Sequence, residues 1–326
     1  MSWTLDLVVW LQHTPAWWHG VMAFFSFLGT ETFYLLLLPL IYWSVDAGLG
    51  LRLAIMLMTS TGLNSVLKMA LHTPRPGWVS PAVRPAAAEA SFGMPSGHAQ
   101  NAVAFWGEFA RGLKKPWAWA LAVGLAFLIG LSRLTLGAHF PQDVLVGWLV
   151  GLVWLGLFAR LEPAAVAWWQ RQSRARKIWG AWWISMAVFL PAVVVRFIVA
   201  RSWVLPPQWG AQAVAATGQP IAPFSLDTAL AVSGTLFGLL LGVAWMTSLP
   251  QPPRRPRTRL LRFVVGMVGL VLLFGFLKRL FPGGESVVAE GARFVRYAIG
   301  GVWITAGAPW VFRRLRLDGR GEAFQL

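Results

Sequence analysis

The chain has 326 residues, of which 57% are hydrophobic and only 12% are charged, whereas charged residues make up about 25% of an average soluble domain. This composition excludes an ordinary soluble domain and indicates an integral membrane protein. The net charge of +16 would suit nucleic acid, but Lys and Arg concentrate in short loops between apolar runs, so we expect no nucleic-acid partner. The chain has no Cys, which excludes disulfides and thiol catalysis.

The apolar runs predict an all-α membrane bundle of about nine transmembrane helices. Residues 1–19 come first, as an interfacial N-terminal segment that lacks the basic start and cleavage site of a removable signal peptide. Each later run approaches the roughly 20 residues that cross about 30 Å of hydrocarbon. We expect spans near residues 20–45, 50–71, 97–113, 116–136, 142–160, 178–200, 226–248, 262–281 and 292–312.

Basic residues predict the orientation and the domain boundaries. Alternate loops carry Arg52 and the basic groups at 111–115, 160–177, 254–262 and 313–320. Basic residues in short loops favour the cytoplasmic side, so we expect a multi-pass protein of the plasma membrane with its N-terminus outside and its C-terminus inside. The basic stretch 161–177 then reads as a cytoplasmic linker. It would join a five-span core at 20–160 to a four-span accessory bundle at 178–326, which ends in a basic cytoplasmic tail.

Two predicted helices carry glycine at every fourth position, a pattern that lets helices pack closely. These residues are Gly147 and Gly151 in the fifth span and Gly234, Gly238 and Gly242 in the seventh. The sequence leaves two alternatives open for these faces, packing within one chain or a homodimer formed through them.

Three groups of polar residues interrupt the apolar core. Lys68 and Arg75 lie at the outer end of the second span, Ser96, Gly97 and His98 begin the third, and Arg133, His139 and Asp143 lie between the fourth and fifth. Because the third and fourth spans cross the membrane and return, all three groups are predicted on the extracytoplasmic face.

This combination suits a phosphate group. Lys68, Arg75 and Arg133 would supply three cations, and the two guanidinium groups favour forked contacts with phosphate oxygens. Residues 96–98 would open a helix, whose free N–H groups and positive dipole end favour an anion. The sequence therefore predicts an anion-binding pocket at this end of the core.

His139 and Asp143 are four residues apart, near a predicted helix start. Asp143 could hydrogen-bond one imidazole nitrogen, which would fix the tautomer and free the other nitrogen to act as a nucleophile. His98 could then serve as the general acid for the leaving oxygen.

Each group alone has a simpler explanation. Lys68 and Arg75 could be interface residues that extend their charges toward water, and His139 with Asp143 could form only a helix-start hydrogen bond. A metal site made of His98, His139 and Asp143 would imitate a two-His, one-carboxylate triad. It is disfavoured because the surrounding cations would repel a divalent ion.

Two neighbouring residues are given no catalytic role. His72 lies between Lys68 and Arg75 and is expected at the rim of the pocket. Glu89 lies in the next loop, where it could pair with Arg84.

The motifs K-x6-R-P, P-S-G-H and S-R-x5-H-x3-D begin at Lys68, Pro95 and Ser132. In this order and between apolar spans, they resemble the signature of the type 2 phosphatidic acid phosphatase superfamily, which includes membrane lipid phosphatases and vanadium haloperoxidases. The resemblance covers roughly residues 20–160, so the core is identified as a membrane phosphatase core. It implies that His139 attacks phosphorus to form a phosphohistidine, that Asp143 orients His139, that His98 protonates the leaving group, and that Lys68, Arg75, Ser96, Gly97 and Arg133 hold the phosphoryl oxygens.

The resemblance further implies a metal-independent phosphatase that needs no cofactor. Its partner would be a membrane lipid substrate carrying a phosphate or diphosphate, of the polyprenyl diphosphate or phosphatidate type. Two alternatives stay open, a lipid phosphotransferase that uses the same phosphohistidine and a non-catalytic lipid-phosphate transporter or binding protein.

Overall fold

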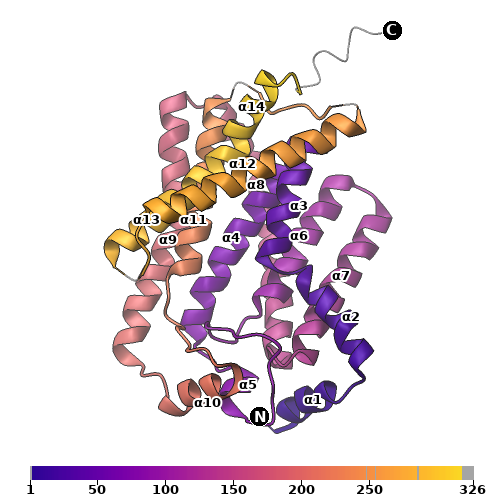
Figure 1. The fold of residues 1–326 in the computed structure, drawn as a ribbon, viewed down its shortest axis with the longest axis vertical. Coiled ribbons are helices and arrows are strands. Elements are labelled where there is room, and N and C mark those ends of the chain that lie inside the picture. Colours follow the sequence, from indigo (N-terminus) through magenta and orange to yellow (C-terminus); the bar gives the residue numbers. More distant parts are fainter. Residues whose placement is uncertain (1, 247, 254, 285, 318–326) are drawn as a thin grey trace. The chain divides into compact units, whose positions relative to one another are not determined.

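The structure, a computed structural model, describes residues 2–246, 248–253, 255–284 and 286–317, and these residues form helices joined by loops (Figure 1). Proline occupies the first turn of α5, α7, α10 and α12, where its missing N–H would have no intrahelical partner in any case. The helices are α1 (Ser2–Gln12), α2 (Ala16–Phe27), α3 (Glu31–Ser44), α4 (Ala47–Leu71), α5 (Pro76–Val79), α6 (Gly97–Leu113), α7 (Pro116–Thr135), α8 (Pro141–Arg171), α9 (Arg174–Ser202), α10 (Pro207–Thr217), α11 (Asp227–Trp245), α12 (Pro256–Leu280), α13 (Val287–Val302), the π-helical turn η1 (Trp303–Gly307) and α14 (Ala308–Arg314).

Six helical segments of the described chain are long and apolar enough to cross a membrane, namely Ala47–Val79, α7, α8, α9, α11 and α12. The pair α2 and α3 passes the same test only together and is bent by 51°, so the described chain has up to seven spans if this pair is one broken span. The predicted count of about nine is therefore not confirmed. The two remaining predicted spans correspond to α6, with 17 residues, and α13, with 16. Both helices carry charged side chains, such as Glu108 in α6 and Arg293 in α13, which lower their apolar character.

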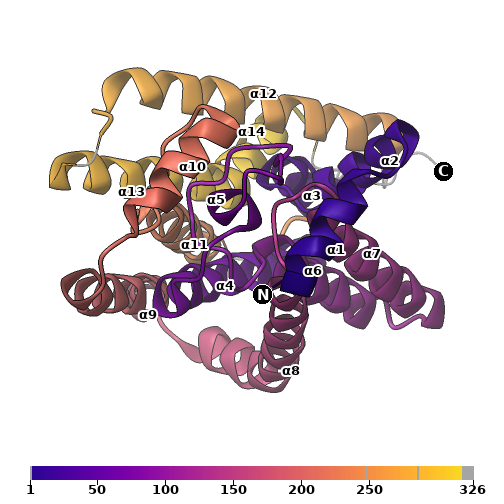
Figure 2. The same cartoon turned by 90° about the horizontal axis from the view of Figure 1, so that it is seen from below.

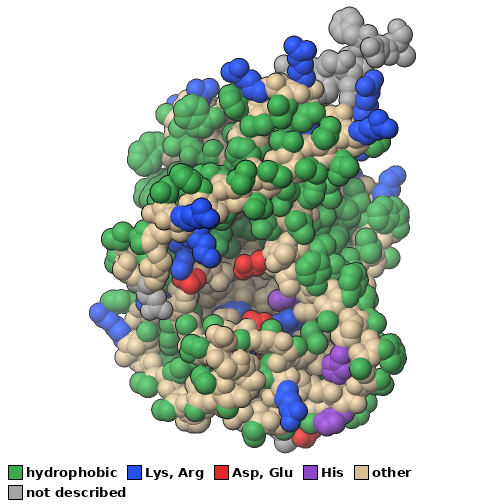
Figure 3. Space-filling model, viewed as in Figure 1, with side chains coloured by type: hydrophobic (Ala, Val, Ile, Leu, Met, Phe, Trp, Pro, Cys, Tyr) green, Lys and Arg blue, Asp and Glu red, His purple; other side chains and the backbone are tan. Residues whose placement is uncertain are grey.

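The span helices expose apolar side chains, as helices in contact with lipid do. On α8, Leu145, Leu149, Leu152 and Val153 are each about 60% exposed, and their spacing places them along one face of the helix. Apolar side chains also cover much of the face shown in Figure 3. A soluble protein rarely exposes apolar patches of this extent, so the surface supports the membrane assignment.

The described chain forms two compact units, each built from three sequence segments. The first unit comprises Met1–Tyr34, Ser60–Arg160 and Leu190–Leu226, and the second comprises Leu35–Thr59, Leu161–Phe189 and Asp227–Leu326. Residues 190–226, which the sequence placed in the accessory bundle, thus belong to the unit that holds the three polar groups. The predicted linker at 161–177 is mostly helical, since α8 continues to Arg171 and α9 begins at Arg174.

In the first unit, α6 packs on α7, α2 lies against α7, and α10 lies beside α5 (Figure 2). The glycine face of α8 allows a close approach to α6. A Cβ atom on Gly147 would lie 2.7 Å from the carbonyl oxygen of Ser96, and one on Gly151 would lie 2.6 Å from that of Gln100. This glycine face therefore serves packing within one chain.

In the second unit, α11 packs on α13 and its glycine face is also used within the chain. A Cβ atom on Gly234 would lie 2.5 Å from the carbonyl oxygen of Phe294, and Gly238 and Gly242 face α13 and η1 in the same way. Arg262, predicted in a cytoplasmic loop, is instead buried and donates hydrogen bonds to the carbonyl oxygens of Trp43, Gln251 and Leu317. Arg254 and Arg320, also predicted on that side, lie outside the described residues.

Candidate active site

The eight predicted site residues all lie in the first unit, at the ends of helices. Lys68 is in the last turn of α4, Arg75 caps α5, Ser96 caps α6 ahead of Gly97 and His98, Arg133 is in the last turn of α7, and His139 and Asp143 lie at the start of α8. Helix ends carry unpaired backbone groups, so their convergence gives a polar centre inside an apolar protein.

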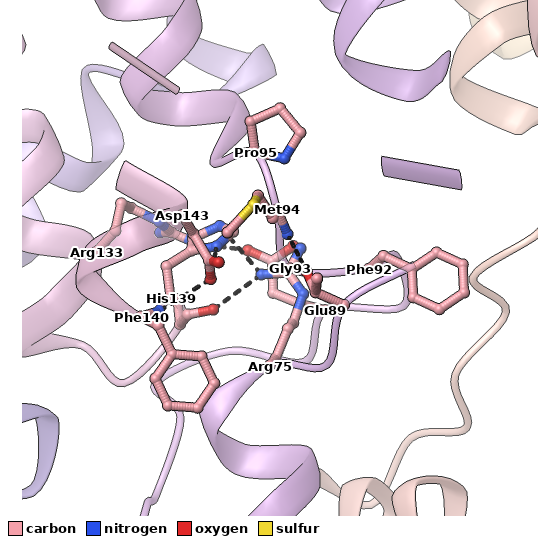
Figure 4. A network of polar contacts seen from close by, with 12 residues as sticks. Arg75, Glu89, Phe92, Gly93, Met94, Pro95, Arg133, His139, Phe140 and Asp143 are labelled. Carbon is pink, nitrogen blue, oxygen red and sulfur yellow. Dashed lines mark hydrogen bonds and ion pairs between the residues drawn. The ribbon is translucent and has the colours of Figure 1, made fainter. Parts of the chain in front are cut away.

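His139 lies between a carboxylate and a guanidinium group (Figure 4). Its Nδ1 is 3.3 Å from Oδ2 of Asp143, and its Nε2 is 3.2 Å from Nη1 of Arg75. An arginine only donates hydrogen bonds, so Nε2 must be the acceptor and the imidazole proton must sit on Nδ1, facing Asp143. The geometry thus assigns the tautomer whose Nε2 lone pair faces the cationic group.

Asp143 also connects two of the motifs. Its Oδ2 accepts a hydrogen bond from the backbone N–H of Phe140 at 2.9 Å, and its backbone carbonyl accepts one from the N–H of Ser96 at 2.9 Å. Gly93 passes close by, because a Cβ atom there would lie 3.1 Å from Oδ2 of Asp143 and 2.6 Å from the carbonyl oxygen of Pro74. A larger residue at position 93 would push the loop away from the carboxylate.

The loop at 80–96 holds the two cations of the first motif. Nζ of Lys68 donates to the carbonyl oxygens of Phe92, at 2.5 Å, and Gly93, at 3.3 Å. Arg75 donates from Nε to the carbonyl oxygen of Ser91 at 2.6 Å and from Nη2 to its hydroxyl at 3.1 Å. Both cations are buried, and these backbone contacts fix the directions of their side chains.

Glu89 is a charged residue of the site that the sequence reasoning missed. Its carboxylate pairs with Arg133 at 2.5 Å and with Arg75 at 3.4 Å, not with Arg84. Burial would raise the pKa of Glu89, but the positive charges of Arg75 and Arg133 outweigh it and lower the pKa to about 2. Glu89 is therefore an anion across the physiological pH range. It forms ion pairs with Arg75 and Arg133, two of the residues predicted to bind phosphate.

Three buried polar atoms of the site have no hydrogen-bond partner among the described residues. They are Oγ of Ser96, Nε2 of His98 and Nε of Arg133. A buried polar group without a partner costs about 1–3 kcal/mol, whereas a phosphoryl oxygen would accept from the hydroxyl and guanidinium donors. The roles of Ser96 and Arg133 in holding phosphate stay a prediction, for which these two atoms would supply unused donors.

The electrostatic surroundings keep His139 neutral. Burial lowers the pKa of His139 well below its usual value of 6.5, and the positive charges of Arg75, Lys68 and Arg133 lower it further. Only a neutral imidazole has a nitrogen lone pair with which to attack phosphorus. The cations that would bind the substrate therefore also favour the nucleophilic form of His139.

Other supporting residues carried no signal in the sequence. Ser26 accepts a hydrogen bond from Nη1 of Arg133 at 2.6 Å, and Asn64 donates to the carbonyl oxygen of Pro95, at 3.2 Å, and to Gln100, at 2.8 Å. Gly29 leaves room for His98, since a Cβ atom at Gly29 would lie 2.7 Å from Cδ2 of the imidazole. Among the residues that the structure describes, no group of three or more His, Asp or Glu side chains is placed to hold a metal ion.

Comparison with known proteins identifies the family to which this chain is related. The sequence pattern of the PAP2 superfamily matches residues 49–167, and that of the PAP2 superfamily phosphatase transmembrane extension matches residues 230–320. Phosphatidylglycerophosphatase B of Bacillus subtilis is 34% identical over 154 residues, which cover 42% of this chain and 71% of that protein.

Two further relatives widen the range of substrates named. Undecaprenyl-diphosphatase of Sulfolobus acidocaldarius is 30% identical over 136 residues, which cover 41% of this chain and 65% of that protein. Glucose-6-phosphatase catalytic subunit 1 of Haplochromis nubilus is 26% identical over 287 residues, which cover 74% of this chain and 76% of that protein. All three relatives are named as enzymes that remove phosphate. The chain therefore belongs to the PAP2 superfamily and is a membrane phosphatase with the transmembrane extension of that superfamily.

Proposed function

We propose that the protein hydrolyses a phosphate monoester or diphosphate carried by a membrane lipid, through a phosphohistidine formed on His139. The contact between Arg75 and Nε2 of His139 carries the proposal, because it assigns the imidazole lone pair to Nε2, the nitrogen that lies beside a group expected to bind phosphate. The relatives named phosphatidylglycerophosphatase and undecaprenyl-diphosphatase support this substrate class.

In the first step Nε2 of His139 attacks phosphorus, and the P–O bond to the leaving group breaks as the P–N bond forms. The Nδ1 proton stays on His139 and faces the Asp143 carboxylate, which stabilises the positive charge that develops on the ring. His98 gives its proton to the departing oxygen. Burial and the positive charge of Arg133 lower the pKa of His98 to about 3 in the free protein, so the negative charge of the bound phosphate is needed to hold this proton on His98. Lys68, Arg75, Ser96, Arg133 and the N–H groups at the start of α6 stabilise the charge that builds up on the phosphoryl oxygens.

In the second step water attacks the phosphohistidine. His98 accepts one proton of that water, the P–N bond breaks, and Nε2 of His139 recovers its lone pair. Inorganic phosphate then leaves the residues that hold the phosphoryl oxygens. The protonation state of His98 at the end of this step is that required at the start of the next cycle.

We place this reaction at the extracytoplasmic face of the plasma membrane. Basic residues at 111–115 and 160–177 lie at the helix ends opposite those that carry the site. By the positive-inside rule those ends face the cytoplasm. The site would therefore meet lipids of the outer leaflet.

The test is phosphate release by the detergent-purified full chain from phosphatidylglycerophosphate, phosphatidate, undecaprenyl diphosphate and glucose 6-phosphate. We expect release from at least one of the lipids, loss of release in His139→Ala, and normal release in His13→Ala, which removes an exposed histidine. Substrate labelled with ³²P should leave acid-labile, base-stable label on the wild type and none on His139→Ala.

Other outcomes would select the alternatives. Label transferred to an added lipid or sugar alcohol in preference to water would identify a phosphotransferase. Saturable binding of a lipid phosphate without release or label would identify a binding or transport protein. Equal release by the His139→Ala variant would refute the phosphohistidine.

A further inference from the structure

The segment Trp203–Leu226 lies outside both sequence patterns of the superfamily, which match 49–167 and 230–320. It contains α10 and the loops on either side of it, and we call it the strap. The strap nevertheless belongs to the unit that holds the active site. Its α10 lies beside α5, the short helix that follows Arg75 (Figure 1).

The strap encloses the side chain of Phe92. The Phe92 ring is fully buried and points away from the polar centre (Figure 4). Its centroid lies 5.5 Å from that of Trp203 and 5.2 Å from that of Phe224, both in the strap. A backbone hydrogen bond from Ala222 to the carbonyl oxygen of Ala90, at 3.1 Å, ties the strap to the chain two residues before Phe92.

The backbone of Phe92 in turn holds a phosphate ligand. Its carbonyl oxygen accepts the 2.5 Å hydrogen bond from Nζ of Lys68, and the next carbonyl, of Gly93, accepts a second at 3.3 Å. A lysine ammonium group has three N–H donors on a flexible stem. With two donors held by backbone carbonyls, the direction of the third is set by the position of Phe92.

The strap touches the first motif at a second point. Trp203 lies 5.0 Å, centroid to centroid, from His72, which follows α4 and has a φ of 38°, a left-handed conformation that few non-glycine residues adopt. Trp203 therefore packs on the turn that leads from Lys68 to Arg75 as well as on the loop that anchors Lys68.

The strap also borders the phosphate site directly. A pocket next to the catalytic centre is lined by Arg75, Glu89 and Ala138 and by strap residues Thr217, Gln219 and Ile221. A substrate that enters beside the Arg75–Glu89 pair thus contacts the strap. The same segment is therefore suited to position the phosphate-binding residues and to limit access to them.

We propose that Trp203 and Phe224 of the strap are positioning residues that clamp Phe92 and thereby aim Lys68 at the phosphate. The proposal rests on the proposed function in taking Lys68 as a phosphate ligand. It assigns a role in catalysis to a segment that neither superfamily pattern includes.

The experiment measures kcat, KM and the affinity for inorganic phosphate in full-length Trp203→Ala, Trp203→Phe and Phe224→Leu. The control is Val204→Ala, since Val204 is 84% exposed. Phosphate affinity is taken from the stabilisation that phosphate confers against thermal unfolding, a readout that needs no activity. We expect Trp203→Ala to weaken phosphate binding and lower kcat/KM by about 10-fold to 100-fold, the range that small misplacements of a catalytic group produce. Trp203→Phe should recover most of this loss.

A double-mutant cycle separates positioning from general destabilisation. If the clamp acts through Lys68, then Trp203→Ala should have little further effect on phosphate affinity in a Lys68→Gln background. An additive loss in that background, or wild-type phosphate affinity in both Trp203→Ala and Phe224→Leu, would overturn the proposal. If Trp203→Ala does not fold, the same cycle with Phe224→Leu decides. Failure of the wild type to release phosphate from any substrate would refute the proposed function alone, because the phosphate-binding cycle would still report on the clamp.

Discussion

Nη1 of Arg75 lies 3.2 Å from Nε2 of His139, so the guanidinium group expected to bind the substrate also covers the nitrogen expected to attack it. A phosphoryl oxygen that accepts this N–H takes the place of Nε2 as its acceptor and leaves the lone pair free. Substrate binding and release of the nucleophile are then one event. This coupling needs a donor with the reach and fixed fork of arginine.

Arg75→Gln and Arg75→Lys test that coupling. We expect Arg75→Gln to lower kcat/KM by about 100-fold or more, as removal of one donor to a developing oxyanion does in other enzymes. Arg75→Lys should recover little, because an ammonium group cannot replace the forked donors. The matched control is Arg84→Gln, which removes an exposed arginine from the following loop. Steady-state kinetics are the measurement, and near wild-type activity of Arg75→Lys would contradict the role of the fork.

Asp143→Asn tests the charge beside His139 while keeping its shape. Oδ2 of Asp143 accepts from both Phe140 and His139, so an asparagine oxygen can occupy the same position. The Nδ1 proton would keep an acceptor, but the negative charge that stabilises the developing imidazolium would be lost. We expect kcat to fall by about 100-fold to 10,000-fold, the range seen when a buried orienting carboxylate is neutralised, with KM changed far less. Unchanged kcat in a folded variant would remove Asp143 from the mechanism.

The pH dependence of kcat/KM reports the ionisation of His139 together with that of His98, because this ratio follows the essential acid and base of the free enzyme. Burial and the charges of Arg75, Lys68 and Arg133 lower the pKa of His139 well below 6.5, so the neutral nucleophile persists as the pH falls through 6.5. The corresponding contribution to folding stability is complete above pH 6.5 and is lost below it, where the unfolded chain takes up a proton that the folded protein does not. We expect no loss of kcat/KM from His139 protonation between pH 7 and pH 6. Arg75→Gln removes one of these positive charges, so the fall of kcat/KM at low pH should begin at a higher pH in this variant. The assignment would be contradicted if kcat/KM of the wild type fell near pH 6.5 and the variant fell at the same pH.

The sequence was informative where chemistry and spacing are local. The three motifs place cations, histidines and a carboxylate at helix ends, and the structure brings those residues together at the predicted ends. His139 and Asp143 meet because α8 begins at Pro141, so the carboxylate in its first turn reaches back to the residue just before the helix. Helix positions in the core were also predictable from the apolar runs, since each is long enough to leave a clear signal.

The sequence was uninformative where position depends on contacts between distant segments. Glu89 lies in a loop without periodicity, so nothing local shows that it faces Arg133 and not Arg84. The strap was assigned to the accessory bundle because it follows the fifth span in sequence, yet its aromatic residues pack on Phe92. The predicted number of spans exceeded the number that the structure supports because of α6 and α13. Both helices are short and carry charged residues, so neither is long and apolar enough to count as a membrane span.

Glu89→Gln tests whether this carboxylate competes with phosphate. With a pKa of about 2, Glu89 stays charged at any pH used for assay and pairs with Arg75 and Arg133, both expected to bind phosphate. Its neutralisation should tighten inhibition by inorganic phosphate several-fold, on the order of the 1 kcal/mol that a partly exposed pair contributes. Asp6→Asn is the control, because it removes an exposed carboxylate from α1. Weaker inhibition in Glu89→Gln would show that Glu89 orders the two arginines for phosphate and does not compete with it.

The orientation of the protein can be tested cleanly because the chain has no Cys, so a single introduced thiol is the only site for maleimide. We choose Ala87→Cys in the exposed loop beside the active site and Lys115→Cys between α6 and α7, at the opposite helix ends. The positive-inside rule places the second position in the cytoplasm. An impermeant maleimide added to intact cells should label Ala87→Cys and leave Lys115→Cys unmodified, and lysis should make both reactive. The reverse pattern would place the active site at the cytoplasmic face and require the substrate to be a lipid of the inner leaflet.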